Sequence, residues 1–166
     1  ATDELQLIKS IAGKVNSPVG ELEKKIEALL EQQKALEKEL KAIQQKNAAS
    51  AAKGLITKAT TIQGIPAIVE NIGTLEGDAL QDMVNSLKSQ FSGVVVLGSR
   101  APNGAVALVA SVAPEFTAKV QAGKMIQTIA PIVGGKGGGK PDNARGGGKD
   151  ADKLDEALAK AKSLLG

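Results

Sequence analysis

The sequence predicts an α+β fold: an N-terminal helical hairpin or coiled-coil arm, followed by a small globular domain with a four-stranded sheet and flanking helices. Two observations lead to this prediction. Apolar residues repeat with alternating steps of four and three through residues 19–43, a spacing typical of packed helices. Beyond position 54 the apolar period changes to two, which is typical of strands. We therefore expect the arm at 1–53 and the domain at 54–166, with a glycine-rich loop at 134–149.

The arm is expected to contain two helices. Apolar residues lie at helical spacing from about Thr2 to Val15, which predicts the first helix. Ser17 is a favourable N-cap and Pro18 suits the first helical position, so a second helix is expected to begin there.

The second helix carries an apolar seam with Gln33 at one of its inward positions. The predicted seam residues share the heptad spacing; they are Leu22, Ile26, Leu29, Leu36, Leu40 and Ile43. About 30 helical residues extend ~45 Å, and a first helix folded back as a hairpin covers only about half of that length. The remainder predicts a homodimer through the arm, or else packing against absent parts of a longer protein, and the sequence leaves both open.

The globular domain is expected to hold four strands and three longer helices. The strands are predicted at 55–62, 65–72, 94–99 and 105–112. The helices are predicted at about 78–91, 124–133 and 151–165, the last with Leu154, Leu158 and Leu164 facing inward. The run at 94–99 is apolar throughout and so should be central in the sheet.

Composition excludes several function classes. The 166 residues include no Cys and no His, which removes thiol catalysis, thiolate zinc sites and the commonest general base. Two Phe and no Tyr or Trp disfavour binding of bases by aromatic stacking. We expect no catalytic residue, no metal and no cofactor, and hence a non-enzymatic chain that is cytoplasmic and has no membrane partner. Its start without Met indicates a piece of something longer.

The glycine-rich stretch raises the question of a site. Residues 134–149 read GGKGGGKPDNARGGGK, in which eight of sixteen positions are glycine. A P-loop is rejected because Pro141 occupies the position of the magnesium-binding hydroxyl and lacks an N–H. A dinucleotide-binding fingerprint, G-x-G-x-x-G, is rejected because Lys140 or Asp142 stands where its third glycine belongs.

Two interpretations of the stretch remain. It is a flexible tether, or a surface whose exposed backbone meets nucleic acid. Four basic residues against Asp142 give it a local charge of +3, equal to that of the whole chain, which favours phosphate binding. These residues are Lys136, Lys140, Arg145 and Lys149. Its position between two helices of one domain also favours a site.

The motif GGKGGGKPDNARGGGKD, followed by an Ala/Leu-rich helix, resembles the C-terminal domain of alanyl-tRNA synthetases, called C-Ala or DHH-associated. The resemblance extends upstream through VVVLGS, VALVASV and the arm, over residues 20–166. It implies a non-catalytic tRNA-binding module that contacts the tRNA elbow by shape and supports aminoacylation and editing by the other domains of a parent ligase, with the arm able to dimerise.

The resemblance assigns the tRNA contacts to the glycine triplet and its basic neighbours. The candidate residues are Lys136, Gly137, Gly138, Gly139, Lys140, Arg145 and Lys149. Two alternatives remain: the substrate-binding half of a DHH-type phosphoesterase, whose catalytic half would need His ligands that this chain lacks, and a pure oligomerisation module.

Overall fold

The computed structural model describes residues 2–166, which form two compact units divided between Ile43 and Gln44. The first unit contains α1 (Thr2–Lys14), a 3-10 turn at Val19–Glu21 and the first part of α2 (Leu22–Ile56). The second contains the last turns of α2 and a mixed sheet with its helices. None of the helices within 2–166 combines the length and the apolar character needed to cross a membrane.

Both helices of the first unit form as predicted, but the hairpin between them is not seen. Among residues 2–43, only Ala12 is buried, and apart from the half-buried Leu22 the large apolar side chains of both helices are exposed. α1 ends at Lys14, and the φ of 52° at Asn16 lets the Ser17 N–H donate to the Ala12 carbonyl at 2.9 Å. The apolar spacing indicates that one face of each helix packs against another surface, but it does not specify which surface that is.

The sheet has six strands within the described residues, two more than predicted. They are β1 (Thr60–Ile62), β2 (Ile65–Thr74), β3 (Val94–Arg100), β4 (Val106–Val112), β5 (Lys136–Gly139) and β6 (Asn143–Gly148). Their spatial order is β1-β2-β3-β4-β6-β5. Only the β2–β3 pair is parallel among these neighbours, and α3 (Gly77–Lys88) makes that crossover.

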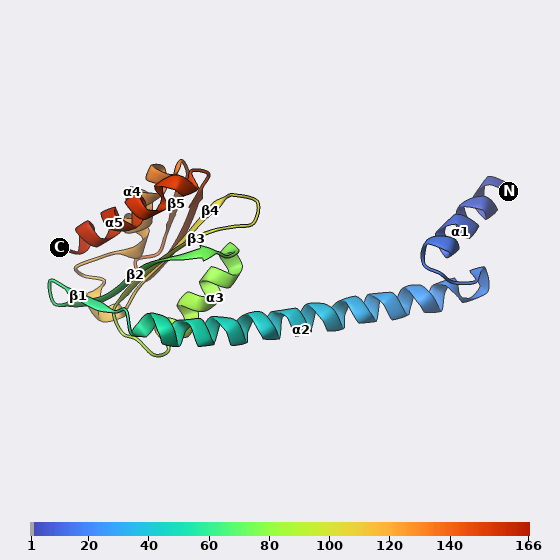
Figure 1. Ribbon diagram of the computed structural model, residues 1–166, viewed down its shortest axis with the longest axis horizontal. Coiled ribbons are helices and arrows are strands. Elements are labelled where there is room, and N and C mark those ends of the chain that lie inside the picture. Colours follow the sequence, from blue (N-terminus) through green and yellow to red (C-terminus); the bar gives the residue numbers. More distant parts are fainter. Residues whose placement is uncertain (1) are drawn as a thin grey trace. The chain divides into compact units, whose positions relative to one another are not determined.

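Helices cover both faces of the sheet (Figure 1). Val94 and Val96 of β3 pack into a core with α4 (Ala122–Ile129) and α5 (Leu154–Leu165). The alternate residues, Val95 and Leu97, pack into a second core with α3 and the last turns of α2. Burial on both sides explains the apolar run at 94–97 in β3, and the central place of this strand confirms the prediction.

Several element boundaries differ from the predicted ones. α2 continues to Ile56, so the strand predicted at 55–62 shrinks to β1. Its extension is explained by Ala48, Ala52 and Leu55, which are buried against the second core one helical turn apart. α5 buries Leu165 and leaves Leu164 38% exposed, which corrects the inward position predicted for Leu164.

Candidate nucleic-acid interface

The glycine-rich stretch is a β-hairpin at the edge of the sheet and not a loop. β5 pairs with β6 in antiparallel register, and β6 pairs with β4. The turn at 140–142 closes with the Lys140 N–H donating to the Asn143 carbonyl at 2.9 Å. Glycine has a low intrinsic strand preference, so these strands form because the edge of β4 and the helix α4 offer them partners.

One face of the hairpin requires glycine because α4 lies directly against it. A Cβ on Gly137 would stand 2.5 Å from Ile126 Cγ2 and 2.4 Å from the Cα of Gly146. A Cβ on Gly146 would stand 2.7 Å from the same methyl group. No side chain fits at such distances, so these glycines let the helix and the hairpin approach closely.

The first glycine of the stretch also has a structural role. Gly134 ends the 3-10 turn at Ala130–Val133 with a φ of 72°. A Cβ there would lie 2.6 Å from Asp150 Oδ2. Glycine commonly adopts the left-handed conformation where a helix ends. Gly134 therefore terminates the helix and is not part of the candidate interface.

The opposite face of the hairpin carries the charge. Lys136 and Gly138 pair with Gly147 and Arg145, and directly paired residues project from the same face. Arg145 forms the one ion pair within residues 2–166, at 3.3 Å from Asp78 near the start of α3. Its side chain is 46% exposed and that of Asp78 95% exposed. Exposed pairs of this kind contribute little stability, so the guanidinium remains free to contact a ligand.

The structure thus brings all the predicted tRNA-binding residues into one hairpin. Lys140 lies at the turn and Lys149 directly after β6, and both are exposed. Gly137 and Gly138 are half-buried and Gly139 is exposed, which leaves peptide groups of β5 open to solvent. The result is a narrow strip of backbone bordered by basic side chains.

Sequence reasoning missed the polar residues of α3 that border this strip. Besides Asp78, Gln81 donates to Asn143 Oδ1 at 3.4 Å, and its own Oε1 is buried without a partner in the described structure. The contacts join residues more than 60 positions apart, and no local pattern signals such a pairing. Within residues 2–166, no three His, Cys, Asp or Glu side chains gather as a metal site.

The second predicted set, the arm seam, lies in the other unit and remains uncovered. Its exposed fractions are 39% for Ile26, 40% for Leu29, 56% for Leu36, 57% for Leu40 and 51% for Ile43. Leu22 is half-buried. Adjacent Leu30, at 53% exposed, widens the apolar stripe beyond the predicted positions.

Known proteins resemble this chain over most of its length. The model of the DHHA1 domain family matches residues 64–166. Alanine–tRNA ligase of Bordetella pertussis is 40% identical over 159 residues, 95% of this chain. That of Idiomarina loihiensis is 38% identical over 160 residues, 96% of this chain. The chain spans 18% of the length of each of these relatives.

A solved structure shows the same likeness. The C-Ala domain from Aquifex aeolicus alanyl-tRNA synthetase has a TM-score of 0.59 and 28% identity to this chain. The match covers 64% of this chain and 96% of that one. The chain therefore belongs to the DHHA1 domain family, and it matches the C-Ala region at the C-terminal end of alanyl-tRNA synthetases.

Proposed function

We propose that this chain is the non-catalytic tRNA-binding module of an alanine–tRNA ligase, acting through the β5–β6 hairpin. The observation that carries the proposal is the charged face of that hairpin, where Lys136, Lys140, Arg145 and Lys149 border exposed glycine backbone. Backbone N–H groups without a Cβ beside them approach phosphates closely, and the flanking cations supply attraction.

Such a surface reads the shape of an RNA more than its sequence. It offers no aromatic ring, because the chain has only Phe91 and Phe116 and neither belongs to the hairpin. A flat peptide strip suits the flat tertiary base pairs at the outer corner of a folded tRNA. The tRNA elbow is therefore the region that we propose it contacts, in support of aminoacylation and editing by the remaining domains of the parent enzyme, in the cytoplasm.

The arm has a separate role in the proposal. Its exposed seam at Leu29, Leu36 and Leu40 has the heptad spacing with which two helices pack together. A second copy of the chain would cover it, so we propose that the arm makes a homodimer. Dimerisation would place two hairpins in one assembly.

The experiment that tests the hairpin is binding of folded tRNA across a salt series. Lys136, Lys140 and Arg145 are changed together to Ala, and a matched control changes Lys153, Lys160 and Lys162, which are exposed on or beside α5. Each phosphate contact contributes about 0.7–0.9 to the slope of log K against log salt. The hairpin variant should bind more weakly with a slope reduced by about two, and the control should bind like the wild type.

The competing outcomes separate the alternatives. If neither the wild type nor the control binds tRNA while the arm still dimerises, the chain is an oligomerisation module. If all three proteins bind with one slope, the RNA lies elsewhere on the chain and the hairpin is only structural.

A further inference from the structure

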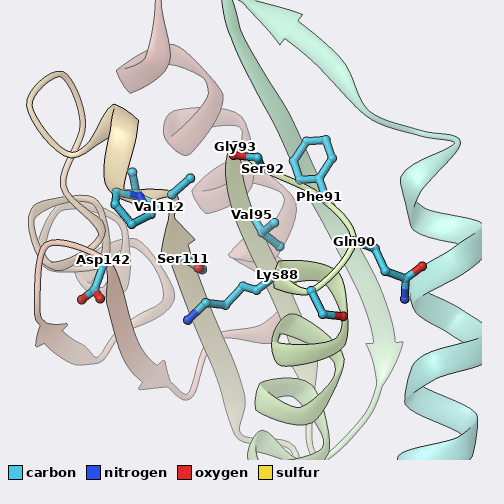
Figure 2. A pocket seen from close by; sticks show the side chains of 12 residues that line it. Lys88, Gln90, Phe91, Ser92, Gly93, Val95, Ser111, Val112 and Asp142 are labelled. Atoms are coloured by element: carbon cyan, nitrogen blue, oxygen red, sulfur yellow. The ribbon is translucent and has the colours of Figure 1, made fainter.

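A cavity of about 460 Å³ lies at the end of α3, on the face of the sheet that also carries Arg145. It is lined by the last residue of α3, the segment that follows it, the end of β4 and the β5–β6 turn. Figure 2 shows Lys88 reaching from α3 toward Ser111, with Asp142 beyond. Its size is typical of small-ligand sites, and the interface described above does not use it.

Ser111 lies at the floor of the cavity. Ser111 is 2% exposed, and its hydroxyl makes no hydrogen bond to any of the residues 2–166. It lies on β4 opposite Val95 of β3 and Asn143 of β6. Within residues 2–166 the one fully enclosed side-chain N or O atom without a partner is Gln81 Oε1, so the Ser111 oxygen is open to the cavity and can hydrogen-bond a polar ligand there.

Two charged groups at the rim are also unpaired. Lys88 and Asp142 both line the cavity, and neither takes part in an ion pair with a described residue. Lys88 offers only donors, whereas a carboxylate offers two acceptor oxygens. Val95 also lines the cavity, on the face of β3 that packs against α3.

The charges at the rim make a phosphate less suitable than a neutral ligand with N–H donors. The Asp142 carboxylate repels an anion, and the C-terminal end of α3 at Lys88 carries the partial negative charge of the helix dipole. Both favour N–H donors instead. The best match is a planar ring whose edge presents two adjacent donors beside one acceptor.

Guanine has that edge: its N1–H and N2 amine donate and its O6 accepts, and no other common RNA base presents two adjacent donors. We infer that this cavity binds a guanine base, with Asp142 accepting from N1 and N2, Lys88 donating to O6, and Ser111 serving a further ring or sugar atom. Asp142 belongs to the turn of the same hairpin that we propose contacts RNA, so the base would come from the bound RNA if the proposed function holds, and from a free guanine nucleotide if it does not.

The test uses uncharged nucleosides, because these do not depend on the basic hairpin. Backbone amide signals are followed by NMR as guanosine, inosine, adenosine, cytidine or uridine is added to the chain. Guanosine should shift the amides of Ser111 and Asp142, and inosine, which lacks the N2 amine, should bind more weakly. Asp142→Asn should weaken guanosine binding by about tenfold or more, the size of a lost hydrogen bond to a charged group; Asp152→Asn, an exposed carboxylate beside α5, is the matched control.

The inference is overturned if guanosine shifts neither amide, if it binds no better than inosine, or if Asp142→Asn behaves like Asp152→Asn. Ser111→Ala provides a second variant, expected to weaken guanosine binding while leaving the other nucleosides unchanged. Titration with tRNA then identifies the source of the base. A lower tRNA affinity of Asp142→Asn at an unchanged salt slope supports a base of the RNA, and loss of guanosine binding alone supports a free nucleotide. If tRNA does not bind at all, the proposed function fails and the cavity result stands.

Discussion

Replacing Gly137 with Ala tests whether this glycine is needed for packing. The new Cβ would lie 2.4 Å from Gly146 Cα, 2.8 Å from the Arg145 carbonyl oxygen and 2.5 Å from Ile126 Cγ2. Two of these three atoms are backbone atoms of β6, so they can move only if the β5–β6 pairing or the approach of α4 changes. Relief by rotation of a side chain is therefore not available.

The magnitude follows from two opposing terms. Forcing an extra methyl group into a closely packed site costs about 1–3 kcal/mol, and the rigid backbone partners put Gly137→Ala near the upper end. Ala also stabilises the folded state by about 0.5–1 kcal/mol, because it lowers the conformational entropy of the unfolded chain relative to Gly. The net loss is about 2 kcal/mol. For a chain of this size, that lowers the melting temperature by about 4–8 °C.

Scanning calorimetry is the suitable assay, because the chain has no Trp or Tyr for fluorescence. Gly138→Ala is the matched control: its nearest heavy atom, Gln127 Nε2 at 3.3 Å, is the end of a flexible side chain. This control should melt within about 2 °C of the wild type and yet bind tRNA more weakly, because its methyl group covers the backbone strip. If Gly137→Ala melts within about 1 °C of the wild type, the reasoning from close approach is refuted.

Two further predictions concern the arm and the second core. Changing Leu29 and Leu36 together to Asp should convert the dimer to a monomer in sedimentation equilibrium. The control, Ala28→Asp with Ala35→Asp, adds the same charge outside the seam and should leave the measured mass unchanged. If the wild type is a monomer even at high concentration, the seam is not a dimer interface. Ser99→Ala should cost about 1–2 kcal/mol in urea unfolding, because the fully buried Ser99 hydroxyl donates to the Leu75 carbonyl at 2.8 Å. The comparable exposed bond from Ser89 to Ser86, at 2.7 Å, should cost less than about 0.5 kcal/mol when Ser89 becomes Ala, and equal losses would contradict the burial argument.

The sequence predicted the elements whose own residues determine them. β3 and β4 and the helix α3 carry continuous or periodic apolar patterns, and each forms where expected. The end of α2 was harder to predict, because Gly54 signals a helix end while Ala48, Ala52 and Leu55 find burial against the sheet. Tertiary packing overrides the local preference there.

β5 and β6 could not be predicted from local patterns, since strand signals depend on side chains that alternate between two faces. KGGG and NARGGG offer almost none, and their pairing depends on β4 and α4, which are contributed by other parts of the chain. The basic residues of the candidate site were identifiable because charge is visible in the sequence. Asp78, which contacts Arg145, and Gln81, which contacts Asn143, were not identifiable, because only the folded sheet brings α3 beside β6.

The two interpretations of the glycine-rich stretch, a site or a structural segment, apply to opposite faces of one hairpin. Gly137 and Gly146 face Ile126 and lack room for a side chain, so their absence of a Cβ is explained by packing alone. Gly138 pairs with Arg145 on the other face, where the atoms nearest to an added methyl group all belong to the flexible Gln127 side chain of α4, the closest at 3.3 Å. Packing does not require glycine at that position. An open backbone beside Arg145 is what a nucleic-acid surface would require, and this is why Gly138, more than any neighbouring glycine, should separate RNA binding from stability.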